Sequence, residues 1–504
     1  MKKNLLEIFE SIVRSHSSDT AIEEKNKQIT FNELRTVSLI LATSIYKNGF
    51  NKNEVGAVLL PKSINCVVAD LALGYCNGIY MNIDVNAPLD RIFKILEHIQ
   101  PRILITSSEI INKMPLLQKN FELILIDKIE KKDIDVKSII DKLESAIDTD
   151  PYTIINTSGS TGIPKGVVLN HRNFLDFLDW SVEEYKFNSQ TIIGSLSPSI
   201  FDIYSFELML MMARGAKLVL IPEEYGAFPA SLPNYINIKK INFIFWVPTV
   251  MVNISKYDIL KYSNLDSLKL IWFAGEVFPT IHFNYWKKKL PFSRFVNLYG
   301  PIEITLDCTF YEVKRELRDD EPIPIGKACI NTDLLILNEL NKKCCIDEIG
   351  ELCVRGSSLA MGYFNDLERT ERLFIQNPLN SNYPELIYRT GDLVKMQSDG
   401  DIIFIGRADQ QIKRNGYRID LQEIEHVLVS QIGVFRNACA LYDKDNNKIN
   451  IFYESEEKQD IYTIKKKLSK LLPKYMIPDL FFFMVELPRN VNGKIDRHYL
   501  TSLQ

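Results

Sequence analysis

Residues 157–166 read TSGSTGIPKG, and this stretch gives the first indication of the fold. It combines glycines, hydroxyl side chains and one lysine, directly after a strand-like run at 152–155. Glycines let backbone amides approach an anion closely, and a lysine adds a point charge suited to phosphate oxygens. A flexible surface turn has the same composition. The stretch lacks the spacing of the common Gly-x4-Gly-Lys-Ser/Thr loop. Pro164 stands where that loop has its second glycine, and Lys165 is followed by Gly166 and not by serine or threonine.

The surrounding sequence predicts an α/β fold. Short apolar runs rich in β-formers occupy residues 191–193, 243–246, 268–273 and 294–296. Helical stretches such as 206–212 lie between them. Buried strands that alternate with helices are typical of parallel sheets layered with helices. In such sheets, ligands bind beyond the carboxyl ends of the strands, where the glycine-rich and acidic motifs of this chain lie.

A chain of 504 residues is longer than one core normally supports, so at least two domains are expected. After residue 400 the pattern changes to a strand at 401–405, a helix at 420–430, a hairpin at 437–453 and a helix at 460–471. This pattern predicts a small, mobile α+β C-terminal domain, residues 407–504, after a large N-terminal core, residues 1–406. We expect a hinge near residues 406–409.

Composition narrows the class of protein. The 60 basic and 64 acidic residues give a net charge of -4, so no nucleic-acid partner is expected. The apolar run at 243–252 is too short to span a bilayer, and Glu7 and Glu10 interrupt the N-terminal apolar pattern, so we expect no membrane segment and no secretory signal. The eight cysteines form no Cys-x-x-Cys pair, which favours reduced thiols and a cytoplasmic location.

Four further motifs follow in a specific order: NLYGPIEIT at 297–305, YRTGD at 388–392, GRADQQIKRNGYRIDLQEIE at 406–425 and NGKIDR at 492–497. Each alone could be a turn. Together with TSGSTGIPKG, they resemble the adenylate-forming (AMP-binding) superfamily of acyl-CoA synthetases, firefly-type luciferases and nonribosomal peptide synthetase adenylation domains. The resemblance covers essentially the whole chain. The segment FAGEVFP at 273–279 is most similar to the amino-acid-activating branch, in particular to D-alanine–D-alanyl carrier protein ligases.

The resemblance implies an ATP site. In it, Asn297, Tyr299 and Gly300 lie on the adenine side, with Tyr299 stacked on the base. Asp392 accepts the ribose hydroxyls, and Arg407 makes a second nucleotide contact. The β- and γ-phosphates are implied to contact the following residues of the loop: Thr157, Ser158, Gly159, Ser160, Thr161 and Lys165.

The resemblance also implies the catalytic groups. Lys494 would bridge the substrate carboxylate and the α-phosphate, Glu303 would help to hold Mg²⁺, and Asp409 would be the hinge residue. Read without the resemblance, Lys494 is a solvated lysine in an Asn-Gly turn and Glu303 is an acid at a helix start. The family's usual threonine is replaced by Ile302, which removes a hydroxyl donor near the phosphates and could weaken nucleotide binding.

The acid substrate is implied by Asp202, within SPSIFDIYSFELML. In the amino-acid-activating branch this carboxylate binds the substrate α-ammonium, and a paired charge tolerates burial better than a lone one. An N-cap of the following helix is the alternative. Three bulky aromatics in the implied side-chain pocket favour a small amino acid, and one pocket residue, Asp307, would contact a polar group or turn outward. The implied pocket residues are Ile203, Phe206, Phe245, Trp272, Ala274, Leu298, Leu306 and Asp307.

The expected activity has two steps. The amino acid carboxylate attacks the α-phosphate of ATP to form aminoacyl-AMP, and a thiol then displaces AMP. Because the chain ends soon after NGKIDR, we expect that thiol on the phosphopantetheine arm of a separate carrier protein. Three alternatives stay open: an acyl-CoA ligase of a small carboxylic acid, a ligase that forms an amide, and a non-catalytic binding protein that kept the fold.

Overall fold

A computed structural model describes residues 4–129, 136–158, 164–263, 265–408, 410–489 and 495–503. The chain forms two compact units. The first comprises residues 1–84, 100–155 and 166–408, and the second comprises 85–99, 156–165 and 409–504. The second unit therefore combines the C-terminal part of the chain with two short segments from much earlier in the sequence.

A nine-stranded sheet forms the centre of the first unit. Six neighbouring strands are parallel, with antiparallel strands at both edges. The parallel strands are buried on both faces, as their continuous apolar sequences require. In spatial order the strands are β15 (Lys327–Ala328), β14 (Thr309–Glu312), β13 (Arg294–Tyr299), β12 (Leu270–Phe273), β11 (Phe243–Trp246), β9 (Ile192–Ser195), β10 (Lys217–Leu220), β1 (Thr20–Glu24) and β2 (Lys27–Thr30).

A second sheet has seven strands, and its central strands are also parallel. One edge strand, β18, pairs antiparallel with β8. In order the strands are β18 (Gly362–Tyr363), β8 (Lys165–Asn170), β7 (Pro151–Thr157), β4 (Ile79–Asn82), β3 (Val55–Val58), β5 (Ile103–Thr106) and β6 (Leu123–Leu125).

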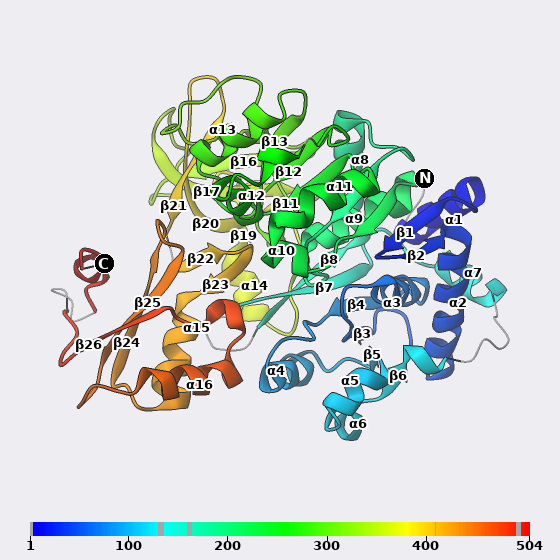
Figure 1. Cartoon of the computed structure of the whole chain (residues 1–504), viewed down its shortest axis with the longest axis horizontal. Helices are drawn as coiled ribbons and strands as arrows, with labels where there is room; N and C mark the ends of the chain where they lie inside the picture. Colours follow the sequence, from blue (N-terminus) through cyan, green and yellow to red (C-terminus); the bar gives the residue numbers. More distant parts are fainter. Residues whose placement is uncertain are drawn as a thin grey trace. The chain divides into compact units, whose positions relative to one another are not determined.

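Two helices of the first unit are buried almost all round, α3 (Ile64–Tyr75) and α9 (Asp202–Arg214). Such helices lie inside a protein rather than on its surface. The helix α3 contacts β3 and β4 of one sheet and β1 of the other, and α9 contacts β9 and β10 (Figure 1). The other helices of the unit are α1 (Leu5–His16), α2 (Phe31–Lys47), α5 (Ser108–Lys113), α6 (Leu117–Asn120), α7 (Val136–Leu143), α8 (His171–Tyr185), α10 (Glu224–Ala227), α11 (Leu232–Lys239), α12 (Pro248–Lys256), α13 (Thr280–Lys289) and α14 (Leu367–Leu373).

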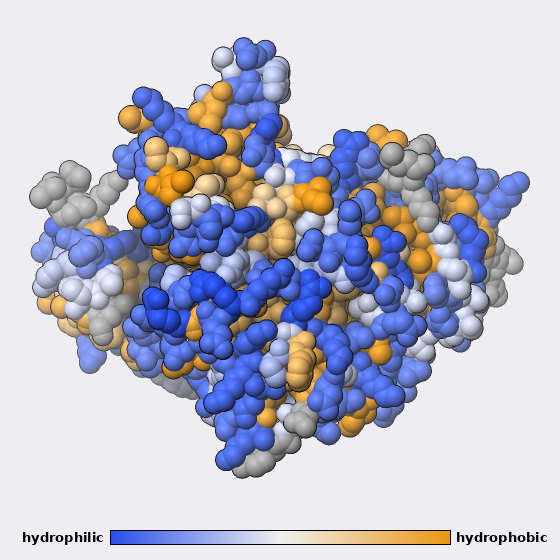
Figure 2. Space-filling model, turned by 90° about the horizontal axis from the view of Figure 1, so that it is seen from above, coloured by the Kyte–Doolittle hydropathy of each residue, from blue (hydrophilic) through white to orange (hydrophobic). Residues whose placement is uncertain are grey.

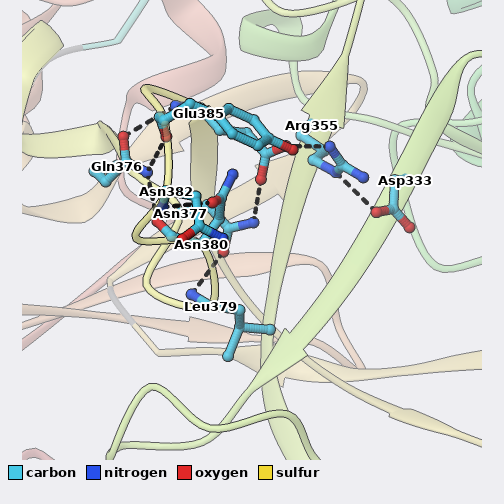
Figure 3. A network of polar contacts seen from close by, with 9 residues as sticks. Asp333, Arg355, Gln376, Asn377, Leu379, Asn380, Asn382 and Glu385 are labelled. Atoms are coloured by element: carbon cyan, nitrogen blue, oxygen red, sulfur yellow. Dashed lines mark hydrogen bonds and ion pairs between the residues drawn. The ribbon is translucent and has the colours of Figure 1, made fainter.

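A smaller antiparallel sheet completes the first unit. Its strands are β16 (Thr332–Leu337), β17 (Ile349–Gly356), β20 (Leu386–Met396) and β19 (Phe374–Gln376), with β21 (Ile402–Arg407) paired to β20. A polar network fixes the loop between β19 and β20 (Figure 3). In it, Arg355 donates to Asp333 at 2.8 Å and also to Glu385, and Asn377 donates to Glu385 at 2.5 Å. This network ties the start of β20 to β16 and β17.

The second unit has its own apolar core, formed by α15 (Leu421–His426), α16 (Ile461–Leu471) and the sheet strands β24 (Asn437–Asp443), β25 (Lys448–Glu454) and β26 (Leu480–Met484). A separate hairpin pairs β22 (Gln411–Arg414) with β23 (Tyr417–Asp420), and α17 (Arg497–Thr501) follows near the end. From the earlier sequence, α4 (Leu89–Ile99) joins this unit through Arg91, which donates to the buried Glu423 at 2.6 Å.

The surface carries both hydrophobic and hydrophilic residues. On the face drawn in Figure 2, hydrophobic residues form patches that hydrophilic residues interrupt. None of the helices in the described part of the chain is long and apolar enough to cross a membrane. All eight cysteines are free thiols.

The predicted α/β class with large, mainly parallel sheets is confirmed. The strand predicted at 243–246 is β11, the run at 152–155 lies within β7, and the hairpin predicted at 437–453 is the pair β24 and β25. The helix predicted at 420–430 is α15, which continues as a π-helix at Val427–Ile432. The mobility of the C-terminal part and a domain boundary between residues 406 and 407 stay predictions.

A buried polar cluster joins α3 to α9 in the first unit. Tyr204 of α9 donates to Asp70 of α3 at 2.8 Å, and the Asn82 amide donates to the same carboxylate oxygen at 3.2 Å. Within the described residues, the other Asp70 oxygen has no hydrogen-bond partner. Burial raises the pKa of Asp70 to about 7, although both hydrogen bonds act to lower it.

We predict that Asp70→Asn raises stability at alkaline pH. A carboxyl group whose folded-state pKa is raised stabilises the fold fully below its unfolded pKa of 3.8, and that contribution is lost as pH rises through about 7. The loss is on the order of 4 kcal/mol. The amide keeps the acceptor for Tyr204 without the cost of ionisation. Thermal unfolding between pH 5 and pH 9 measures this.

The unfolding temperature of the variant, relative to that of the parent, should rise from pH 5 to pH 9, because the parent loses this contribution between pH 3.8 and about pH 7. Asp141→Asn, at an exposed position of α7, is the control and should follow the parent at both pH values. An Asp70→Asn variant with the parent's pH profile would contradict the prediction.

Candidate active site

The candidate site lies at one edge of the nine-stranded sheet. The strands β13, β12, β11 and β9 are neighbours and parallel, so their carboxyl ends meet at this edge. Phe245 pairs with Trp272 across β11 and β12, and Phe273 pairs with Asn297 across β12 and β13. Motifs separated by up to a hundred residues are therefore brought together by strand register, at the place where ligands bind in parallel sheets.

Asp202 is the first residue of α9 and follows β9 after a short loop. The N-cap position is Phe201, so the alternative role of Asp202 as the N-cap is wrong. Its Oδ1 accepts the Ile203 backbone N–H at 2.9 Å. A helix N-terminus stabilises a negative charge, which favours an ionised carboxylate at this position.

The aromatic residues of the predicted pocket pack directly on one another. The rings of Phe206 and Trp272 are stacked with centroids 5.3 Å apart, and Phe245 meets both edge-on at 6.1 and 5.4 Å. All three side chains are fully buried. Ala274, Leu298 and Leu306 are buried too, and Ile203 lies in the first turn of α9. This packing leaves little space between the three rings.

The segment after β13 turns back sharply. Thr305 and Leu306 have φ values of 52° and 64°, which non-glycine residues rarely adopt. The Thr305 hydroxyl donates to the Ser358 carbonyl at 2.8 Å and the Cys308 N–H donates to the Tyr299 carbonyl at 2.8 Å. These bonds hold the strained backbone in place and keep Asp307 buried. Asp307 therefore does not turn outward to solvent, which was one of its two predicted orientations.

Glu303 lies in a short 3-10 helix, Ile302–Ile304, and is almost fully buried. Its Oε1 accepts the hydroxyl of Tyr363 at 2.6 Å. Tyr363 comes from β18 of the seven-stranded sheet. A phenol donates a hydrogen bond and brings no positive charge of its own, so this contact fixes the orientation of the Glu303 carboxyl group.

Asp392 lies in the middle of β20 and is buried. Its Oδ1 accepts from Arg407 at 2.6 Å, and its Oδ2 accepts from the Tyr299 hydroxyl. Burial raises the pKa of Tyr299 well above its usual range, so the phenol stays a donor. Ionised carboxylate oxygens have about four lone-pair sites, so Asp392 retains acceptor capacity for hydroxyl groups of a ligand.

Asn297 and Gly300 flank Tyr299. The Asn297 amide donates to the Pro324 carbonyl at 2.7 Å, which fixes its orientation. A Cβ on Gly300 would lie 2.3 Å from the Leu306 carbonyl oxygen and 2.5 Å from the Asp307 Cα. Only glycine allows the backbone to approach so closely.

Parts of the predicted phosphate loop belong to the second unit. Thr157 ends β7, Ser158 follows it, and Lys165 begins β8. The Ser158 hydroxyl donates to the Arg418 carbonyl at 2.7 Å and accepts from the Asp420 N–H at 3.1 Å. A serine has one hydroxyl hydrogen, so Ser158 can donate to a phosphate only when its bond to Arg418 is broken. The predicted residues Gly159, Ser160, Thr161, Asp409 and Lys494 lie outside the described residues.

Sequence reasoning missed the residues that orient the two acids. Tyr363 stands 60 residues after Glu303, in a segment without a motif, so no local spacing indicates their contact. The resemblance implies a stacking role for Tyr299, and no motif indicates that its hydroxyl bonds to Asp392.

Comparison with known proteins identifies the family. Residues 9–364 match the family model described as AMP-binding enzyme. The chain belongs to this family. Its resemblance to the adenylate-forming superfamily and to the amino-acid-activating branch, expected from the motifs, is confirmed.

Two curated relatives illustrate the similarity. Zwittermicin A synthase ZmaJ of Bacillus cereus is 31% identical over 514 residues, which cover 100% of this chain and 95% of ZmaJ. Gramicidin S synthase 1 of Brevibacillus brevis is 29% identical over 99% of this chain, but the chain spans only 44% of that protein.

Solved structures show the same fold. One is the Vibrio cholerae adenylation domain AlmE in complex with glycyl-adenosine-5'-phosphate, with a TM-score of 0.85 and 21% sequence identity. The superposition covers 100% of this chain and 98% of the AlmE chain. An artificially fused adenylation–PCP di-domain protein from Klebsiella oxytoca, NpsA-ThdA, has a TM-score of 0.81 at 21% identity, covering 95% of this chain and 93% of its own.

We predict that Gly300→Ala disrupts the site of this AMP-binding enzyme. The new methyl group collides with backbone atoms of the 306–307 segment, which cannot rotate away. Overpacking of this kind costs about 1–3 kcal/mol. The midpoint of thermal unfolding should fall, and AMP binding measured by calorimetry should be lost.

Gly226→Ala is the matched control, because a Cβ there meets only the Leu196 side chain at ordinary contact distances of 3.7 and 4.0 Å. This control should bind AMP like the parent. Normal AMP binding by Gly300→Ala would contradict the prediction, because residues 306–307 would then make room for the methyl group while the nucleotide still binds.

Proposed function

We propose that the chain activates a small, D-alanine-like amino acid as aminoacyl-AMP, using ATP and Mg²⁺, and transfers the aminoacyl group to the phosphopantetheine thiol of a separate carrier protein. The observation that carries the proposal is that Asp202 begins α9, the helix whose Phe206 ring packs against the rings of Phe245 and Trp272. Asp202 and Phe206 are four residues apart on α9, so they face the same side of the helix.

The nucleotide would bind along β13 and β20. Tyr299 and Asn297 would contact the adenine, and Asp392 would accept the ribose hydroxyls while Arg407 holds its carboxylate in place. Lys165 would donate to the phosphates, together with Thr157 and Ser158. Lys494 would stabilise the negative charge that develops as the substrate carboxylate attacks the α-phosphate and pyrophosphate leaves.

Glu303 is the residue that would hold Mg²⁺. The described residues contain no cluster of three or more His, Cys, Asp or Glu side chains that could cage a metal. Mg²⁺ in nucleotide sites is usually held by one or two carboxylates and the phosphate oxygens, so a single oriented carboxylate fits it. The ion would neutralise charge on the phosphates.

The amino acid would place its ammonium at Asp202 and its side chain toward the aromatic rings. An ammonium paired with a carboxylate tolerates burial, whereas a lone carboxylate there gains nothing from a substrate without an amine. AlmE, which has the same fold, was solved with a glycyl adenylate, and this supports a small substrate. NpsA-ThdA joins an adenylation domain to a PCP domain, which supports a carrier protein as the acceptor.

Pyrophosphate exchange with a panel of amino acids tests the proposal. Glycine, serine and both enantiomers of alanine should support exchange, because the packed rings leave little space. Leucine, phenylalanine and tryptophan should not. Asp202→Asn should abolish most of the exchange, since the ammonium then loses its charged partner, worth about 2–3 kcal/mol or roughly 30- to 160-fold.

The alternatives predict other results. Exchange with acetate or propionate at rates equal to glycine and alanine would indicate an acyl-CoA ligase of small carboxylic acids. Loading of a phosphopantetheine carrier protein, followed by mass spectrometry, separates thioester formation from an amide-forming ligase. Exchange with large side chains alone would contradict the small-substrate proposal.

We predict that Tyr363→Phe raises the Mg²⁺ concentration needed for half-maximal exchange by about tenfold, because groups that orient a metal ligand contribute 10- to 100-fold to affinity. The lost hydroxyl is the donor that fixes Glu303. A Mg²⁺ titration at saturating ATP and amino acid measures the effect. Tyr383→Phe, at an exposed tyrosine, is the control and should leave the titration unchanged. If both variants need the same Mg²⁺ concentration, Tyr363 does not contribute to metal binding and the prediction is wrong.

A further inference from the structure

The loop that leads to Asp202 is held by a lysine from another part of the first unit. The Lys62 ammonium donates to the backbone carbonyls of Ser195, at 2.9 Å, and of Ser197, at 3.0 Å. Ser195 is the last residue of β9, and Asp202 begins α9 only seven residues later. Lys62 lies between β3 and α3 of the seven-stranded sheet, so it connects the two sheets at this loop.

The loop depends on this lysine for part of its hydrogen bonding. Ser195 and Ser197 are buried, and buried carbonyl groups require donors. The Ser195 carbonyl also accepts the Ile221 N–H at 2.8 Å. Among the described residues, the donor to the Ser197 carbonyl is Lys62. Hydrogen bonds from a charged donor are about twice as strong as neutral ones.

The position of Lys62 is itself fixed. Ser63, the N-cap of α3, accepts from the Cys66 N–H and donates to the Pro61 carbonyl at 2.9 Å. The Leu59 N–H donates to the Ile105 carbonyl at 2.9 Å. The short loop that presents the ammonium is therefore bonded at both ends.

Acidic residues of two segments act electrostatically on the Lys62 ammonium. Glu207 projects from α9, five residues after Asp202, and is fully buried, and Glu223 follows β10. Burial lowers the pKa of Lys62, and the attraction of Glu207 and Glu223 acts against that change. The two carbonyl bonds of Lys62 therefore hold the loop that leads into α9.

We propose that Lys62 is a positioning residue for amino acid recognition: by its bonds to Ser195 and Ser197 it places Asp202 where it can bind the substrate ammonium. The inference rests on the proposed amino acid activation. Lys62 lies outside the predicted ATP contacts and the aromatic pocket, so its removal should affect the amine of the substrate and not the nucleotide.

Pyrophosphate exchange of the full chain tests this with Lys62→Met and Lys62→Arg. Lys62→Met should raise the KM for the amino acid by about tenfold or more, as expected for a buried carbonyl left without its donor, while the KM for ATP is unchanged. It should also reduce the preference for glycine over acetate and for alanine over propionate. Lys62→Arg keeps the charge and the donors and should restore most of the lost affinity and preference.

Lys217→Met is the matched control, because this half-buried lysine of β10 pairs with Glu23 at 2.9 Å, away from the loop. It should lower the unfolding temperature without changing the KM for the amino acid. Equal increases in both KM values for Lys62→Met, or no recovery with Lys62→Arg, would overturn the inference. If the parent supports no exchange with any amino acid, the proposed function fails instead.

Discussion

The burial of α9 between two sheets constrains the rest of the first unit. This helix is apolar on nearly every face, so it can exist only where other elements cover it completely. The strands β9 and β10 contact this helix, as do α1 and α8, while Tyr204 bonds to Asp70 of α3 and Ser205 bonds to Tyr80 of β4 in the seven-stranded sheet. Because Asp202 begins this helix, the packing that buries the helix also fixes the position of the carboxylate.

Some polar groups around this helix form hydrogen bonds with residues that lie far away in the sequence. Lys62 donates to the loop before α9 across 133 residues, and Tyr204 donates to Asp70 across 134 residues. A buried polar group without a partner costs about 1–3 kcal/mol, so each of these contacts stabilises the buried position of the helix. The same contacts that stabilise the fold therefore determine the geometry of the candidate site.

The sequence predicted the fold class and the strand ends for a clear physical reason. Buried parallel strands such as Phe243–Trp246 are continuous apolar runs, and the glycine-rich or acidic segments that follow them are visible without a structure. The role of Gly300 could not be predicted in the same way, because its need to be glycine comes from the carbonyl of Leu306, which returns toward it only after a strained turn. Nor does local sequence indicate Lys62 or Tyr363, since a lysine and a tyrosine outside any motif look like many others. The contacts that give them importance are long-range.

Three buried carboxylates of the first unit share one arrangement, in which a tyrosine hydroxyl is the donor. Tyr204 bonds to Asp70, Tyr299 to Asp392 and Tyr363 to Glu303. A phenol fixes the orientation of a carboxyl group through a hydrogen bond and brings no positive charge of its own, and Asp392 accepts from Arg407 as well. For Asp70, which has no second partner among the described residues, the result is a raised pKa. In Glu303 and Asp392 the same contact fixes the orientation of the carboxyl groups that we propose to bind the metal ion and the ribose hydroxyls, whereas in Asp70 it lies within the core.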